Sequence, residues 1–578
     1  MLITYIDKIG DWNPQLMREL KGRFKIRNLS IAVIIAVSIQ ILLLIGFTGQ
    51  LPIDSITTPQ RSRYCTATPP GRYYGDNLLC IQDLLGNWII NWQLWWLDVF
   101  KILSVVGLFI LLVAGTYLLI ADLSKEKSRG TLNFISLSPR SSQNILLGKI
   151  LGVPSIIYLL CAVLSPLHLI AGFKANISPG LILSYYLGII ISCAFFYSLS
   201  LLFGLVISGL GGFQSFLYSG LVLMFLSVTT SVLFSSSDFI SHTPLDWIML
   251  FYPGTILAYL VESTYIPVKT ANIDYETLHQ FAWYGKQFWH NSFLGISFIF
   301  ANYSLGIYWI SRALNRRFRN PNATCINKID SYKMSASFII IATGFVFQSG
   351  GSRDIEYHII ENIVVLQIFI VAFACLLIAA LSPSRQSLYD WARYRHQNHD
   401  NSRSLVRDLI LGEKSPSPLA IALNLGIMFA YLIPTTLIAP LDHPFSLLLG
   451  LFISLNILII YAVVGQRILL FKLPKPDLIA TGVIAILMFI PPLMFSILGL
   501  EPSETITPWL FTIFGVAAFN SDLHLLTLTS VIFPLLSQWL LIALGTTEMS
   551  KRLQKAGESE TRLLLNSLTA NKNYSHLK

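Results

Sequence analysis

Apolar runs of about 20 residues recur along the chain, and they constrain its fold more than any other feature. An α-helix of about 20 residues is long enough to cross the hydrocarbon core of a bilayer, which is roughly 30 Å thick. Only 12% of the 578 residues are charged, about half the share that is usual in a soluble domain. The sequence therefore predicts an all-α polytopic membrane protein. About twelve transmembrane helices are expected, at residues 29–48, 98–121, 150–172, 180–207, 214–234, 291–311, 334–350, 359–381, 419–439, 446–466, 476–500 and 528–547.

The basic residues are distributed unevenly between the segments that join these runs. If the N-terminus is cytoplasmic, the segments on that side hold most of the Lys and Arg, as inner segments usually do. The formal net charge of +10 then reflects topology and contact with the inner leaflet, and it gives no reason to expect nucleic acid as a partner. Both termini are expected in the cytoplasm. The first 28 residues are polar and basic and lead into a run that is long enough to span, so no cleavable signal peptide is expected.

The runs fall into two halves with the same spacing. Each half has one span, an outer segment, a second span entering a long inner loop, three more spans, an outer segment and a last span. This order predicts two parallel six-helix repeats; the alternative is twelve spans whose spacing coincides. The expected parts are a cytoplasmic interfacial helix (1–28), a first unit (29–320), a cytoplasmic linker (321–333), a divergent second unit (334–550) and a cytoplasmic tail (551–578).

A short apolar piece precedes the last span of each half, at 247–260 and at 507–519. Both are too short to span and are interrupted by Pro or Gly. Such pieces enter the bilayer and return where protein or a water-filled cavity covers them. We therefore expect a short re-entrant helix pair in each half, with a hairpin on the membrane surface as the alternative.

The segment NPQLMRELKGRFKIRN begins at Asn13 and precedes the first span. Asn13 is able to cap a helix, and Pro14 fits its first turn. Leu16, Leu20 and Phe24 recur on one face, and basic residues occupy much of the rest. The pattern predicts an amphipathic helix lying along the inner leaflet, and an ordinary basic flank is the alternative.

Two of the six cysteines, Cys65 and Cys80, share the outer loop after the first span. In an oxidising compartment they are able to form a disulfide that closes a short loop. Two unrelated free thiols are the alternative. The spacing of the cysteines indicates no metal site.

Most of the groups that power transport or catalysis are missing from the sequence. The middles of several spans, such as 102–120 and 478–500, contain no ionisable residue, which argues against an ion-coupled antiporter and against a channel lined by charged rings. His168 lies near a span end and is expected at the interface rather than as a ligand. The chain has no P-loop, no G-x-S-x-G with a Ser-His-Asp set and no H-E-x-x-H. The pattern predicts a membrane pathway without a nucleotide-binding site, and hence no enzyme.

The inner loop after the second span is long. Residues 124–137 suit a short helix with Leu132 and Ile135 on one side and Phe134 at its edge. Pro139 ends this helix, and Ser141 or Ser142 is able to cap the next one. A helix held away from the membrane suits docking of a cytoplasmic partner, and a solvated basic loop is the alternative.

Two segments resemble a known family. EKSRGTLNFISLSPRSSQNILLGKIL, from Glu126, resembles the inner loop of the permease subunits of type-2 ABC exporters, and NPQLMRELKGRF resembles the interfacial helix that opens many of them. The resemblance implies an ATPase-coupling loop containing Glu126, Arg129, Gly130, Thr131, Leu132, Ser138, Pro139, Gly148 and Lys149. It also implies an interfacial helix containing Asn13, Pro14, Arg18, Glu19 and Leu20.

The resemblance further implies two six-span units around a central path, driven by a separate cytoplasmic P-loop ATPase dimer. Mg-ATP would be held by that partner, and this chain would hold no cofactor. The chain would lie in the bacterial inner (plasma) membrane. An uncharged lining suits an amphipathic cargo. The loop of the second half departs from the family pattern, and only Gly412 and Lys414 mirror Gly148 and Lys149. A twelve-span secondary transporter of the facilitator type, and a membrane scaffold or enzyme without transport, are the alternatives.

Overall fold

The computed structural model describes residues 10–52, 61–66, 78–84, 86–207, 211–234, 242–347, 355–397, 405–502, 505–515 and 528–557. The chain divides into two compact units, 1–319 and 320–578, except that Trp283–Lys286 belongs with the second. The predicted tail from residue 558, the end of the second short apolar piece (516–519) and the end of the seventh predicted span (348–350) lie outside the described residues.

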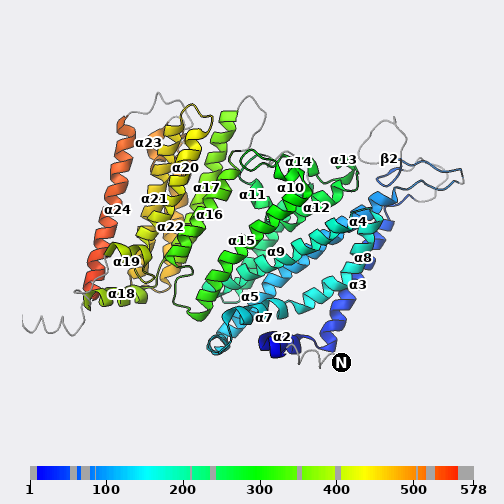
Figure 1. Ribbon diagram of the computed structural model, residues 1–578, viewed down its shortest axis with the longest axis horizontal. Coiled ribbons are helices and arrows are strands. Elements are labelled where there is room, and N and C mark those ends of the chain that lie inside the picture. Colours follow the sequence, from blue (N-terminus) through cyan, green and yellow to red (C-terminus); the bar gives the residue numbers. More distant parts are fainter. Residues whose placement is uncertain are drawn as a thin grey trace, which may run out of the picture. The chain divides into compact units, whose positions relative to one another are not determined.

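The first unit is built from helices, shown in blue to green in Figure 1. Its elements are α2 (Pro14–Arg23), α3 (Ile26–Thr48), β1 (Arg61–Ser62), β2 (Leu78–Leu79), α4 (Trp92–Phe109), η1 (Ile110–Ala114), α5 (Gly115–Ser128), α6 (Thr131–Ser136), α7 (Ser142–Gly152), α8 (Ser155–Lys174), α9 (Pro179–Val206), α10 (Phe213–Phe234), α11 (Asp246–Met249), η2 (Pro253–Thr255), α12 (Ile256–Glu262), α13 (Val268–Ala271), α14 (Tyr275–Gln280), η3 (Phe288–His290) and α15 (Ser292–Arg319). The two strands form one short antiparallel pair.

The second unit is also helical. Its elements are α16 (Lys328–Gly344), α17 (Ile355–Leu381), α18 (Arg385–Gln397), α19 (Leu405–Leu411), α20 (Pro418–Ile438), α21 (Pro444–Leu470), α22 (Pro476–Ile497), α23 (Ile506–Trp509) and α24 (Leu528–Gly557).

Eleven helices within the described residues are long and apolar enough to cross a membrane, and each coincides with a predicted span. The remaining predicted span, 334–350, coincides with α16, which has only 17 residues. The predicted helical, multi-pass membrane architecture is confirmed at this level.

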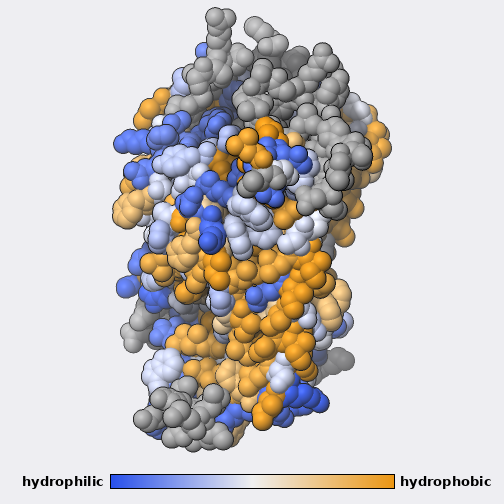
Figure 2. All heavy atoms as spheres, turned by 90° about the vertical axis from the view of Figure 1, so that its right-hand side faces the viewer, coloured by the Kyte–Doolittle hydropathy of each residue, from blue (hydrophilic) through white to orange (hydrophobic). Residues whose placement is uncertain are grey.

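The surface of the first unit agrees with this architecture. On α3, large apolar side chains such as Ile34, Leu42 and Ile45 are 61–69% exposed. Figure 2 shows hydrophobic side chains gathered over the middle of one face, with hydrophilic ones toward its ends. Such a surface is stable against lipid and unstable against water.

The second span is longer than predicted, because α4, η1 and α5 form one continuous helix from Trp92 to Ser128. Its middle turn, Ile110–Ala114, is π-helical. The Tyr197 hydroxyl donates a hydrogen bond to the Leu111 carbonyl there, at 2.7 Å. A π turn displaces backbone carbonyls from their regular partners, so a side-chain donor stabilises it.

The first short apolar piece consists of α11, η2 and α12, and most of its apolar side chains are buried within the unit, whereas Ile248 is 36% exposed. Polar side chains satisfy its carbonyls where the helices break: the Tyr303 hydroxyl donates to the Phe251 carbonyl (2.8 Å) and the Thr255 hydroxyl to the Met249 carbonyl (2.7 Å). In the second unit, Gln538 donates to the Leu510 carbonyl in the same way (2.9 Å). This burial argues against a hairpin lying on the surface of the first unit.

His168 does not lie at an interface, which corrects the sequence-based expectation. It is 6% exposed, and its Nε2 lies 2.8 Å from the Ser104 hydroxyl and its Nδ1 2.9 Å from the Tyr186 hydroxyl. Its ring stacks on Phe100, with 4.1 Å between centroids. Satisfied hydrogen bonds and stacking explain how a polar ring is accommodated inside the helix bundle.

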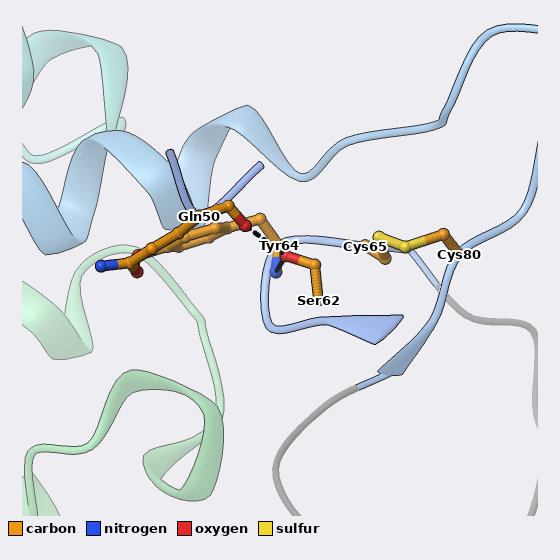
Figure 3. Close-up of a disulfide and its surroundings, with 5 residues drawn as sticks. All are labelled: Gln50, Ser62, Tyr64, Cys65 and Cys80. Atoms are coloured by element: carbon orange, nitrogen blue, oxygen red, sulfur yellow. Dashed lines mark hydrogen bonds between the residues drawn. A yellow bond between two sulfur atoms is a disulfide. The ribbon is translucent and has the colours of Figure 1, made fainter. Parts of the chain in front are cut away.

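Cys65 and Cys80 form a disulfide at the end of the first unit opposite α2 (Figures 1 and 3). The part of the outer loop just before Cys65 is anchored to the chain just after α3: the Ser62 hydroxyl donates to the Gln50 carbonyl at 3.0 Å, and the Tyr64 hydroxyl lies 3.4 Å from Gln50 Oε1. Cys65 therefore follows a segment that is attached to the end of the first span.

A buried charge cluster fixes the same loop to the start of the second span. Asp98 is 7% exposed and contacts Lys101 Nζ (2.6 Å), Arg63 Nε (3.1 Å) and the Tyr64 hydroxyl (3.1 Å). Lys101 also donates to the Ala271 carbonyl, and Arg63 to the Thr270 carbonyl. Burial, reinforced by the Asp98 carboxylate, raises the pKa of Tyr64, so that its hydroxyl remains a donor.

Candidate functional site

The N-terminal helix α2 is attached to α7 through its capping residue. The Asn13 side chain accepts a hydrogen bond from the Leu16 amide at 3.0 Å, which is the predicted cap. Its amide nitrogen donates to the backbone and side-chain oxygens of Asn144 on α7, at 2.7 Å each. These two residues are 131 positions apart, so the cap also joins two distant segments.

The apolar face of α2 packs on protein, and the location of this helix along the inner leaflet stays a prediction. Leu16 and Leu20 are 7% and 9% exposed, and α2 contacts α7 and α8. Two glycines one turn apart on α7 permit the contact: a Cβ on Gly148 would lie 2.9 Å from the Leu16 amide nitrogen, and one on Gly152 would lie 2.6 Å from Glu19 Cβ. Small residues at this spacing allow helices to approach closely.

Replacement of Gly148 by alanine adds a methyl group that overpacks the contact with α2, at a cost of up to about 3 kcal/mol. Alanine returns about 1 kcal/mol of helix propensity, so we expect the stability of the first unit to fall by up to about 2 kcal/mol. The thermal unfolding midpoint of the purified chain measures it. Gly220→Ala is the matched control, because a Cβ at Gly220 meets open space. Equal midpoints for the two variants would contradict the close approach.

Six charged side chains from α2, α5 and α7 form what we call the ion-pair network: Arg18, Glu19, Arg23, Asp122, Glu126 and Lys149. Lys149 lies at its centre with 1% of its side chain exposed. Its Nζ is 2.6 Å from Glu126 Oε2, 2.8 Å from Asp122 Oδ2 and 3.9 Å from Glu19 Oε1. Such a lysine stays charged only if carboxylates compensate its loss of water.

Two arginines of α2 complete the network. Arg18 contacts Glu126 and, at 3.2 Å, Glu19. Arg23 contacts Asp122 at 2.9 Å and Glu19 at 3.4 Å. Burial acts to lower the pKa of the Arg18 guanidinium, but Glu126 and Glu19 raise it overall. Three cations thus balance three carboxylates across three helices.

The same carboxylates do not form a free metal site. Oxygens of Glu19, Asp122 and Glu126 lie within 4.8 Å of one another, which is a spacing that suits a metal ion. The Lys149 ammonium group already lies between them and supplies the positive charge. The residues present therefore fit an ion-pair network better than a cation site.

The inner loop is divided into two helices instead of the single predicted helix over 124–137. The second span continues to Ser128, and Gly130, with a φ of +72°, turns the chain into α6. The Thr131 hydroxyl donates to the Glu126 carbonyl at 3.1 Å, across this turn. Only glycine adopts such a φ without strain, which accounts for the break.

The predicted orientation of α6 is confirmed: Leu132 and Ile135 are 8% and 9% exposed. Phe134 and Leu137, in contrast, are 82% and 84% exposed. Beyond Ser138 and Pro139, Ser141 caps α7 by accepting a hydrogen bond from the Asn144 amide. The end of the loop therefore presents two large apolar side chains on a short, anchored helix.

The sequence pattern gave Asp122 and Leu137 no role, and it did not predict that Arg23 joins an ion-pair network or that Phe134 is exposed. One signal for Asp122 was present, since Asp122 and Glu126 are four residues apart and so share one face of α5. Their common partner Lys149 was not visible, because it lies on another helix.

The second unit does not reproduce this arrangement. Lys414, which mirrors Lys149 in the sequence, is exposed, and Gly412 directly follows α19. The buried lysine of this unit is Lys328, which donates to the Leu409 carbonyl (2.6 Å), the Ser415 hydroxyl (2.7 Å) and the Pro416 carbonyl (3.1 Å). Neutral oxygens surround Lys328, whereas carboxylates surround Lys149, and the ion pair of this loop joins Arg395 and Asp408 instead (2.7 Å).

No family model, curated protein or solved structure matches this chain.

Proposed function

We propose that this chain is the membrane-spanning permease subunit of an ATP-driven exporter, with ATP hydrolysis on a separate P-loop ATPase. One observation carries the proposal: the two motifs that resemble type-2 ABC exporters meet in the ion-pair network. Arg18 and Glu126, one from each motif, are 108 positions apart and form an ion pair. Two unrelated coincidences in sequence would not be expected to form one ion-pair network centred on a buried lysine.

The geometry also suits transmission of force. In the proposed complex, the ATPase binds the exposed apolar side chains of Phe134 on α6 and of Leu137 directly after it. A pull on α6 passes to α7 and α2 through Lys149, and to the second span through Asp122 and Glu126. Mg-ATP stays on the partner dimer. This chain holds no cofactor and transmits the movement of the ATPase to its membrane spans.

The packing of the spans supports the two parallel repeats. In the first unit, the first and third spans pack together (α3 and α8), as do the fourth and sixth (α9 and α15). The equivalent pairs of the second unit, α16 with α20 and α21 with α24, also pack together. Broken helical pieces before each last span agree with the proposed re-entrant pairs.

We place the end that carries α2 and α6 in the cytoplasm of a bacterium, with the chain in its plasma membrane. The concentration of basic residues at this end supports the orientation. The disulfide at the opposite end suits an oxidising outer side. An amphipathic cargo fits spans that carry few charges.

Co-purification tests the proposal. We expect a P-loop ATPase to accompany the tagged chain from native membranes in mild detergent, and Phe134→Ser/Leu137→Ser to reduce the recovered ATPase at least tenfold, because the loss of two buried apolar contacts weakens docking by several kcal/mol. The matched control is Leu84→Ser/Tyr265→Ser, since these two large side chains are at least as exposed as Phe134 and Leu137. Absence of any ATPase from the wild-type sample would contradict the proposal and favour a secondary transporter or a scaffold.

A further inference from the structure

Three segments of the second unit meet at the end that carries α18. Leu388 and Ala392 on α18 are buried against Leu470 of α21 and against Met549 and Leu553 of α24. Figure 1 shows α18 lying across the ends of these spans. The helix is therefore fixed at the level where the apolar spans end.

This end of the unit is strongly basic. Residues 385–397, 405–411, 467–477 and 548–557 contain ten Lys and Arg against four Asp and Glu. Carboxylates accompany some of the cations: Arg395 pairs with Asp408 at 2.7 Å, and Arg467 and Arg552 share Glu548. Exposed cations among the others include Arg393, Lys472, Lys475, Lys551 and Lys555.

Aromatic side chains lie among these cations. Tyr394, next to Arg393, is 62% exposed, and Phe471, next to Lys472, is 38% exposed with the Arg552 guanidinium 4.3 Å from its ring centroid. On the adjoining part of α24, Leu540 and Leu544 are more than half exposed. Aromatic and basic side chains above an apolar band are typical of the headgroup layer of a membrane.

We propose that this surface binds the headgroups of anionic phospholipids. The α18 surface, as we call it, consists of Arg393, Tyr394, Lys472, Lys475, Lys551 and Lys555. Its cations pair with lipid phosphates, its aromatic rings lie at the depth of the glycerol backbone, and α24 contacts the acyl chains. The inference is independent of the proposed ATPase partner, because it concerns another unit of the chain and another ligand.

Lipid titration of the full-length chain tests this inference. The chain is purified in a neutral detergent without the ATPase, and native mass spectrometry follows the binding of added phosphatidylglycerol or of phosphatidylcholine with the same acyl chains. A basic residue near an anionic headgroup contributes about fivefold in affinity. Arg393→Gln/Lys551→Gln/Lys555→Gln should therefore weaken the tightest phosphatidylglycerol binding about a hundredfold and leave phosphatidylcholine binding unchanged.

The control removes the same charge from the basic segment next to the first span, in Lys21→Gln/Lys25→Gln/Arg27→Gln. This control variant should change the affinity for phosphatidylglycerol less than threefold. Equal weakening in both variants would mean that general attraction to basic flanks explains the binding, which overturns the inference. Wild-type binding of the two lipids with equal affinity would overturn it as well. A triple variant that keeps its phosphatidylglycerol affinity but loses the ATPase would make the α18 surface a protein-docking site instead.

Discussion

Replacement of Lys149 by methionine should destabilise the first unit by about 3–5 kcal/mol, which is the usual loss when one member of a buried ion pair is removed. Methionine fills a similar volume, so the loss comes from the charges. Asp122 and Glu126 lose an ammonium group at 2.8 and 2.6 Å, and the two arginines of α2 do not neutralise three carboxylates. The thermal unfolding midpoint of the purified chain should fall by several degrees or more.

Two further variants separate this charge effect from a packing defect. Lys149→Met/Glu126→Gln should recover part of the loss, because it restores the balance of two cations and two carboxylates. Lys174→Met, at an exposed lysine, should leave the midpoint unchanged. A Lys149→Met variant that unfolds at the wild-type temperature would show that the network contributes nothing to stability.

Replacement of Asp98 by alanine should have a comparable effect at the opposite end of the unit. Lys101, 3% exposed, would lose its carboxylate and keep its hydrogen bond to the Ala271 carbonyl, and Arg63 would lose the same carboxylate while still donating to the Thr270 carbonyl. We expect a loss of about 3–5 kcal/mol for this uncompensated buried charge. The thermal midpoint measures the loss, and trypsin cleavage after Arg63 should become faster because the disulfide loop is no longer fixed to α4.

Asp98→Asn provides the matched control. Asparagine keeps one oxygen that accepts from Lys101 or Tyr64 but removes the charge, so its loss should be smaller than that of alanine. If both variants resisted trypsin as the wild type does, the loop would be held by the disulfide and by Gln50 alone.

Local patterns in the sequence were enough to find most of the spans and the caps. Hydropathy is a property of consecutive residues, so eleven predicted spans coincide with long helices, and Asn13 caps α2 as its position indicates. The exception, α16, shows the limit of the argument, because an apolar run does not determine where its helix ends.

Contacts between distant segments were not predictable in the same way. The amphipathic pattern of α2 indicated a buried face, but lipid and protein both satisfy such a face, and only Gly148 and Gly152 on α7 decide between them. His168 appeared to be an interface residue because its partners Ser104 and Tyr186 lie on other helices. In the candidate site, the motif residues were visible individually, whereas Asp122 became significant only when Lys149 was placed beside it.

The second span is a single helix that is fixed at both ends, by Asp98 near one end and by Asp122 and Glu126 near the other. A helix that is held near both ends does not tilt freely at one end. If the end near Asp122 and Glu126 moves, either the end near Asp98, about 40 Å away along the helix, moves with it, or the helix bends between the two ends. The π turn at Ile110–Ala114 is the natural position for bending, since its hydrogen-bond ladder is already irregular and Tyr197 supports it from the side. The stiffness of this one turn therefore determines how far a movement of one end of the second span displaces its other end.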